Sequence, residues 1–146
     1  MAEKKPRPSF EFEVFFDNLI TKGRVVKEKQ IAAGFKVQMR PLSAQQQLAA
    51  EAIVVAANPY MPIDTVEKLR GVSIVSQAIL SVNDVLIEVE GAAQADNEVK
   101  RRALHENLMK LPTVVLDELY KFYIECVKEQ NKVYAPGEME KNIENF

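Results

Sequence analysis

The sequence predicts an α+β fold in which an N-terminal extended arm and a β-hairpin pack on a mainly α-helical bundle of about four helices. Two hydrophobic periodicities, and the turn-forming residues between the segments, predict this fold. Apolar residues alternate with polar ones before residue 43, as in strands with one buried face, and recur at steps of three and four after it, as in amphipathic helices. Turn-forming and helix-ending residues separate the segments. The expected divisions are a basic and aromatic arm (1–18), a hairpin (19–42), a helical domain (43–133) and an acidic tail (134–146).

The arm begins with a basic leader. Lys4, Lys5 and Arg7 are interleaved with prolines, which disfavour helix in the residue before them. We expect an extended, solvated leader. A contact of these charges with an acidic partner is the alternative interpretation.

Four of the seven phenylalanines follow within residues 10–16, Phe-Glu-Phe-Glu-Val-Phe-Phe. Alternation across this segment predicts a strand with one apolar face. That face needs a cover, which is either the protein's own helices or a neighbouring subunit. The candidate partner-binding residues are Phe10, Phe12, Val14, Phe15 and Phe16.

A hairpin is predicted next. Residues 23–31 and 35–40 both alternate, and Ala-Ala-Gly at 32–34 supplies the turn. Phe35, Val37 and Met39 fall on one face. Because a lone hairpin is marginal in water, this one must pack on helices or pair with another strand.

The first helix of the bundle is expected from Ser43 to the Asn-Pro step at 58–59. Ser43 and Gln46 stand at capping-box spacing. Leu48, Ala52 and Val55 form one apolar face, and the helix carries few charges. This predicts a position near the centre of the bundle.

A second helix is predicted over residues 64–82 and ends at Asn-Asp. Its β-branched content would also suit strands, but a helical period without proline favours helix. Residues 85–90 alternate briefly and are interpreted as a short strand or an extended link.

Two further helices complete the prediction, at 96–111 and 113–133. The first is expected to point a basic triplet, residues 100–102, outward and four apolar residues inward. The second carries an apolar stripe that Cys126 borders as a small buried side chain. The residues expected to face inward on the two helices are Val99, Leu104, Leu108, Leu111, Leu116, Leu119, Tyr120, Tyr123 and Val127.

Composition narrows the function classes. Nineteen basic and 21 acidic side chains leave a net charge of −2, although residues 1–40 alone carry +4, so nucleic acid and membrane are not the expected partners. One cysteine and one histidine, His105, cannot form the clusters that zinc requires, and His105 is expected on a helix surface. No phosphate-binding glycine loop, dinucleotide fingerprint or calcium loop is present. We therefore expect a non-enzymatic protein without cofactor or metal.

The order of segments resembles small tail-morphogenesis proteins of tailed bacteriophages. The similarity rests on Phe-Phe-Asp-Asn-Leu (15–19) with Thr-Lys-Gly-Arg (21–24), and on residues 35–44, where a hairpin turns into a capped helix. It extends to residues 75–84 and 111–120, and covers roughly residues 15–133. These positions are caps, turns and core, so the resemblance carries over no individual functional residue.

The resemblance implies a role in virion morphogenesis through protein–protein contacts. One branch of these proteins comprises minor baseplate or hub components that stay in the virion. Another comprises tail-assembly chaperones, which bind the tape-measure protein and are absent from the virion. The expected partners are other tail or baseplate proteins in an oligomeric assembly, in the host cytoplasm and then in the virion. A small-ligand-binding or regulatory helical module is the remaining alternative.

Overall fold

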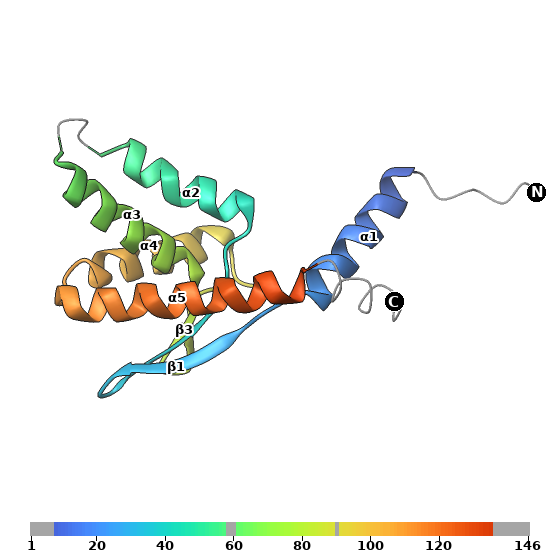
Figure 1. Ribbon diagram of the computed structural model, residues 1–146. Coiled ribbons are helices and arrows are strands. Elements are labelled where there is room, and N and C mark those ends of the chain that lie inside the picture. The colour runs from blue at the N-terminus through green and yellow to red at the C-terminus, as the bar shows by residue number, and fades with distance from the viewer. Residues whose placement is uncertain (1–7, 58–60, 90, 136–146) are drawn as a thin grey trace, which may run out of the picture. The chain divides into compact units, whose positions relative to one another are not determined.

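The computed structural model describes residues 8–57, 61–89 and 91–135, which contain five helices and a four-stranded antiparallel sheet (Figure 1). The α+β class is therefore confirmed. The chain forms two compact units, which are described separately: Val26–Val127, and Met1–Val25 together with Lys128–Phe146. The basic leader (1–7) and most of the acidic tail (136–146) lie outside the described residues.

The larger unit contains the sheet, whose strand order follows the chain. Strands β1 (Lys27–Ala32) and β2 (Phe35–Met39) form the predicted hairpin, with Gly34 at φ +73° in its turn. Val37 and Met39 are fully buried, which places the predicted apolar face against the core. The helices of this unit gather on one side of the sheet (Figure 1).

A second hairpin replaces the end of a predicted helix. The helix expected over residues 64–82 stops at Ala78, and Ile79–Val82 forms β3, which pairs with β2 and with β4 (Val85–Leu86). The β-branched residues prevailed here because β3 completes hydrogen bonds that β2 would otherwise lack. The short strand expected after residue 84 is confirmed for β4.

Asn83 joins the two hairpins at their turns. Asn83 and Asp84 both have positive φ, as a two-residue hairpin turn requires. The Asn83 side chain accepts a hydrogen bond from Lys36 N at 2.8 Å and donates one to Gly34 O at 2.9 Å. This residue therefore stabilises its own turn and ties it to the preceding hairpin.

Helix α2 (Ala44–Val55) begins as predicted but lies differently. Ser43 Oγ accepts from Gln46 N at 3.2 Å, and Gln46 Oε1 accepts from Ser43 N at 3.0 Å, which confirms the capping box. The predicted central position is wrong, because Leu48 is 71% exposed and Val55 81% exposed. Alanines are frequent within the sequence of α2, so this sequence does not define which side of the helix is buried. The buried residues are Ala50 and Val54.

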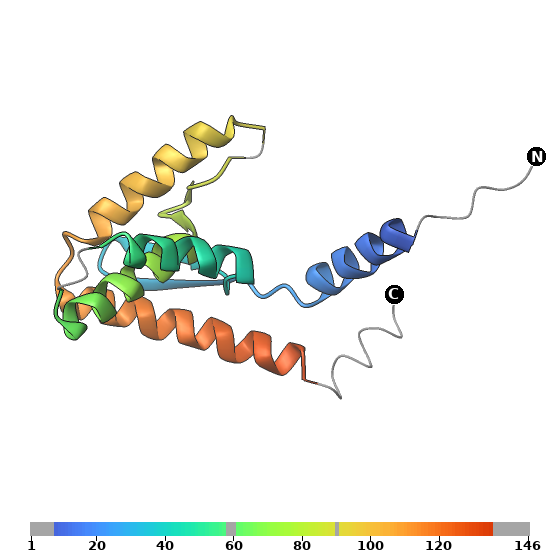
Figure 2. The ribbon, with the colours of Figure 1, turned by 90° about the horizontal axis from the view of Figure 1, so that it is seen from above.

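Helix α3 (Ile63–Ala78) is the central helix instead. Its buried side chains are small or medium-sized, and Ser73 and Ser76 are among them. Small side chains let neighbouring helices approach closely, which explains why α3 rather than α2 occupies the centre. Viewed from above, α4 and α5 diverge from their connection and α3 lies between them (Figure 2).

Helices α4 (Gln94–Leu108) and α5 (Thr113–Val133) follow the predicted helical segments closely. On α4, Leu108 is buried as expected, but Val99 is 61% exposed, contrary to prediction. On α5, Leu119, Tyr123 and Cys126 are buried as predicted, but Tyr120 is 40% exposed, contrary to prediction. The core of the unit consists of Val37, Met39, Leu42, Val72, Val75, Ala78, Ile79, Ile87, Leu108, Leu119, Phe122, Tyr123 and Cys126.

The smaller unit contains α1 (Pro8–Lys22) and the last residues of α5. The strand predicted over residues 10–16 is corrected, because these residues belong to α1. Phe15 interrupts the alternation, and apolar residues continue from Phe12 to Ile20 at the three- and four-residue steps that place them on one side of a helix. Pro8 suits the first turn of a helix.

Candidate functional site

An apolar stripe runs along α1 and is the first candidate surface. Its members stand at steps of i, i+3, i+4, i+7 and i+8, which places them on one side of a helix. We call the following residues the aromatic stripe: Phe12, Phe15, Phe16, Leu19 and Ile20.

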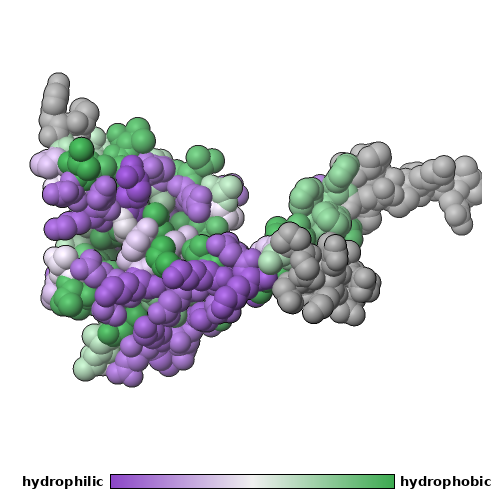
Figure 3. All heavy atoms as spheres, viewed as in Figure 1, coloured by the Kyte–Doolittle hydropathy of each residue, from purple (hydrophilic) through white to green (hydrophobic). Residues whose placement is uncertain are grey.

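The aromatic stripe is open to solvent. Phe12 is 63% exposed and Ile20 61%, and Phe15 and Phe16 are also exposed. The Phe12 and Phe16 rings stack at 6.5 Å between centroids, and the Phe15 and Phe16 rings meet edge to face at 5.6 Å. Figure 3 shows hydrophobic colour over the described part of α1. Exposed aromatic surface of this kind marks an interaction site in soluble proteins.

The predicted partner-binding residues divide on this helix. Phe12, Phe15 and Phe16 come together in the aromatic stripe. Val14 is exposed but lies on the other side of α1, two residues or about 200° away from Phe12. The Phe10 side chain lies outside the described residues.

The C-terminal end of α1 is held by Tyr134. The Tyr134 hydroxyl donates to Leu19 O at 2.9 Å, and the Tyr134 ring lies directly against Gly23. Any side chain at residue 23 would overlap that ring, so a glycine is required for this approach. Within the smaller unit, this contact holds the C-terminal end of α1, which comes after the exposed phenylalanines in the sequence.

A groove between α3 and α5 is the second candidate surface. It has a volume of about 590 Å³. Gly71, Val72, Val75, Leu116 and Tyr120 form its apolar part, and charged residues of both signs line its rims. In Figure 3 the surface is hollowed between these helices, with hydrophilic colour along its edges. We call this feature the α3/α5 groove.

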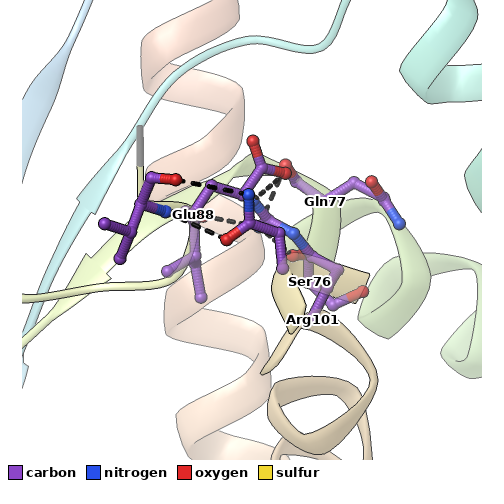
Figure 4. A network of polar contacts seen from close by, with 7 residues as sticks. Ser76, Gln77, Glu88 and Arg101 are labelled. Atoms are coloured by element: carbon purple, nitrogen blue, oxygen red, sulfur yellow. Dashed lines mark hydrogen bonds and ion pairs between the residues drawn. The ribbon is translucent and has the colours of Figure 1, made fainter. Parts of the chain in front are cut away.

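Arg101 on α4 is the centre of a buried polar network (Figure 4). Its Nη1 donates to Ser76 O and Ile79 O, each at 2.6 Å, and its Nη2 lies 2.8 Å from Glu88 Oε1. The last carbonyls of a helix have no partner within the helix, and a cation there also complements the helix dipole. Arg101 therefore caps the C-terminal end of α3.

The expectation that residues 100–102 all face solvent is wrong for Arg101, which is only 8% exposed. The physical reason is the abrupt change from α3 to β3, which leaves buried carbonyls that need donors. Lys100 and Arg102 are exposed, as predicted.

A polar cleft of about 740 Å³ lies between α2, α3 and α4, and His105 lines it. His105 is half-buried rather than on the surface as expected, and its Nε2 is 3.4 Å from Ser73 Oγ. Burial lowers the His105 pKa, opposed by the nearby Glu106 carboxylate, so the imidazole is neutral at pH 7. Ser73 is completely buried, which fits a packing contact rather than a reactive nucleophile.

The Cys126 thiol is enclosed as well. Burial raises the Cys126 pKa to about 11, so its thiol is protonated at neutral pH, and its predicted buried position is confirmed. Within residues 8–57, 61–89 and 91–135, no group of three His, Cys, Asp or Glu side chains could hold a metal ion. None of the described helices is both long and apolar enough to cross a membrane.

Comparisons with known proteins returned no matching family model, no matching curated protein and no matching solved structure.

Proposed function

We propose that this protein is a non-enzymatic structural or assembly protein of a bacteriophage tail or baseplate that acts through protein–protein contacts in virion morphogenesis. The observation that carries the proposal is the aromatic stripe, exposed along α1. Its partners are other tail or baseplate proteins within an oligomeric assembly. It works in the host cytoplasm during assembly and then becomes part of the virion.

The aromatic stripe supports this proposal through its burial energy. Complete burial of one large apolar side chain is worth roughly 1.5–3 kcal/mol. Phe12, Phe15 and Phe16 lie next to one another and carry rigid rings, which are the side chains that dominate protein interfaces. A partner that covered all three would gain enough to offset part of the cost of association.

The burial of the other polar and reactive side chains also favours a role in protein–protein contact over a catalytic one. Ser73 and Cys126 are buried, and the Arg101 guanidinium is engaged with the carbonyls of α3 and with Glu88. The resemblance of residues 15–133 to tail-morphogenesis proteins supplies the biological setting of the proposal.

The proposal is tested in the phage that encodes the chain. We expect deletion of its gene to yield particles without functional tails in electron micrographs, and restoration by wild-type protein supplied in trans. A Phe12→Ser/Phe16→Ser variant should fail to restore tails. The matched control is Leu48→Ser/Val55→Ser, which removes two exposed apolar side chains from α2 and should restore them.

Mass spectrometry of purified virions then decides between the two branches. Presence of the protein supports the structural role. Restored tails without incorporation would support a chaperone that binds the tape-measure protein. Normal tails after gene deletion would contradict both branches.

A further inference from the structure

We propose that the aromatic stripe of α1 docks into an apolar groove of another protein of the assembly, and that one rim of this groove carries basic side chains that face Glu13 and Asp17. The inference rests on the proposed function, because it takes the same contact surface. It adds the chemistry of the partner's binding site and the direction in which α1 lies in it.

The acidic side chains of α1 lie on one flank of the aromatic stripe. At about 100° per residue, Glu13 and Asp17 come next to Phe16 and Ile20 around the helix. Both carboxylates are exposed, and neither makes an ion pair with another described residue. This flank is therefore a free, negatively charged edge beside the apolar rings.

The other flank of the stripe has no such charge. Its helix positions hold Asn18 and, towards the two ends of α1, Glu11 and Lys22, whose charges are opposite. The net negative charge of the helix surface next to the stripe thus belongs to the flank of Glu13 and Asp17. A partner that complements α1 needs basic groups on that side only.

The shape of this surface requires a groove. From Phe15 through the stripe to Asp17, the groups to be contacted cover about 200° of the helix circumference. A flat surface touches only one side of a helix, so a partner that reaches both the rings and the carboxylates must curve around it. Every described side chain from Phe12 to Thr21 is exposed except Leu19, which is half-buried. Docking of a helix into a groove through apolar residues at steps of three and four is a recurrent mode of recognition.

The charged flank sets the direction of the helix in the groove. Glu13 and Asp17 are four residues apart, which is about 6 Å along the helix axis. Two basic side chains at this spacing on one rim would face both carboxylates. If α1 lay in the opposite direction, the carboxylates would meet the other rim. Charge at an exposed rim contributes to orientation and association rate more than to affinity.

The two hollows described in this chain do not have such a rim. The α3/α5 groove is lined by three acidic and three basic side chains, and two of the basic ones are already paired, Arg70 with Glu51 and Lys121 with Glu118. The polar cleft beside α4 is lined by three carboxylates and two arginines, one of them paired within the chain. We therefore assign the groove to a different protein.

The acidic flank also favours a protein groove over a lipid surface. Amphipathic helices that lie in a membrane interface carry Lys and Arg on their polar face, and anionic headgroups attract them. The same headgroups would repel Glu13 and Asp17.

The charged flank is tested in the phage by supplying variants in trans. Glu13→Lys/Asp17→Lys should lower the number of tailed particles by at least about tenfold, because like charges facing each other at an interface oppose binding. Glu13→Gln/Asp17→Asn, which removes the attraction without adding repulsion, should lower it less and serves as the test where the lysines reduce the helix content. The matched control is Val14→Lys/Thr21→Lys, which places two lysines on the exposed side of α1 opposite the stripe and should restore tails.

Second-site revertants of the Glu13→Lys/Asp17→Lys phage then identify the partner. We expect them to replace Lys or Arg by Glu or Asp at the rim of an apolar groove in another tail or baseplate protein. Revertants that change the larger unit of this chain would point to a second copy and overturn the inference.

Two further outcomes would also overturn it. One is sedimentation of the wild type, but not of Phe12→Ser/Phe16→Ser, with phosphatidylcholine/phosphatidylglycerol vesicles, which would assign the stripe to a lipid surface. The other is restoration of tails by Glu13→Lys/Asp17→Lys. If that variant restores tails while Phe12→Ser/Phe16→Ser does not, the proposed function stands and this inference fails. If both variants restore tails, both proposals fail.

Discussion

Arg101 and the aromatic stripe of α1 reverse the usual relation between polarity and burial. A guanidinium is enclosed at 8% exposure, while Phe12 remains 63% exposed. The guanidinium is buried because α3 ends against the sheet and its last carbonyls need donors. The phenylalanines lie on α1, which belongs to a different unit from the one that holds the core. Hydrophobicity alone therefore does not decide which side chains are buried. A charged side chain is buried where buried carbonyls need a hydrogen-bond donor.

The largest expected effect comes from removing the buried charge. Arg101→Met keeps the length of the side chain but leaves Ser76 O and Ile79 O without their donor. We expect the free energy of unfolding to fall by about 3–5 kcal/mol, the cost of breaking a buried, hydrogen-bonded charge network. Urea unfolding followed by circular dichroism measures this loss.

Arg102→Met is the matched control for this variant. Arg102 is exposed on the same helix, so its substitution should change stability by no more than about 0.5 kcal/mol. Equal effects at the two positions would show that Arg101 does not act as the cap of α3.

A smaller effect on stability is expected from ionisation of Cys126. This buried thiol stays neutral at pH 7, whereas the buried Arg101 is charged. Its pKa is raised to about 11 from an ordinary 9.0. The folded state therefore holds its proton more tightly than the unfolded state, and this stabilisation is complete below pH 9 and is lost between pH 9 and 11. The loss amounts to at most about 2–3 kcal/mol.

The measurement compares the wild type with Cys126→Ala over this pH range. The stability difference between the two proteins should shrink as pH rises from 9 to 11, since alanine does not titrate. A constant difference would mean that the thiol ionises as easily in the folded protein as in the unfolded chain.

The smallest effect on stability is expected at the aromatic stripe. Phe12→Ser should change the free energy of unfolding by no more than about 0.5 kcal/mol, because its ring is mostly exposed. Phe122→Ala, in the core of the larger unit, should lower the free energy of unfolding by about 3–5 kcal/mol, measured by the same urea unfolding. A large loss from Phe12→Ser would show that the stripe packs inside its own chain.

The sequence predicts those elements whose signals are local. The turn at Gly34, the capping box of Ser43 and Gln46, and the buried stripe around Leu119 all depend on residues within a few positions of one another. The α+β class follows from them.

The remaining features depend on distant neighbours. Arg101 is buried because of carbonyls on another helix, and no spacing within residues 96–111 indicates this. Ile79–Val82 is a strand because β2 is available to pair with it. Phe12, Phe16 and Ile20 stand at helical spacing in the sequence. Residues 10–16 also alternate as a strand does, and over so short a stretch the two patterns cannot be told apart.

The direct passage from α3 into β3 limits how this protein can vary in length. Ala78 ends the helix and Ile79 begins the strand, with no connecting residue between them. An inserted residue would shift the register of β3 by one and turn Ile79 and Ser81 away from the buried side. Insertions are therefore better tolerated at the exposed Gly91, whereas the join at residues 78–79 requires a fixed number of residues, and the Gly34 turn is held by its hydrogen bond to Asn83.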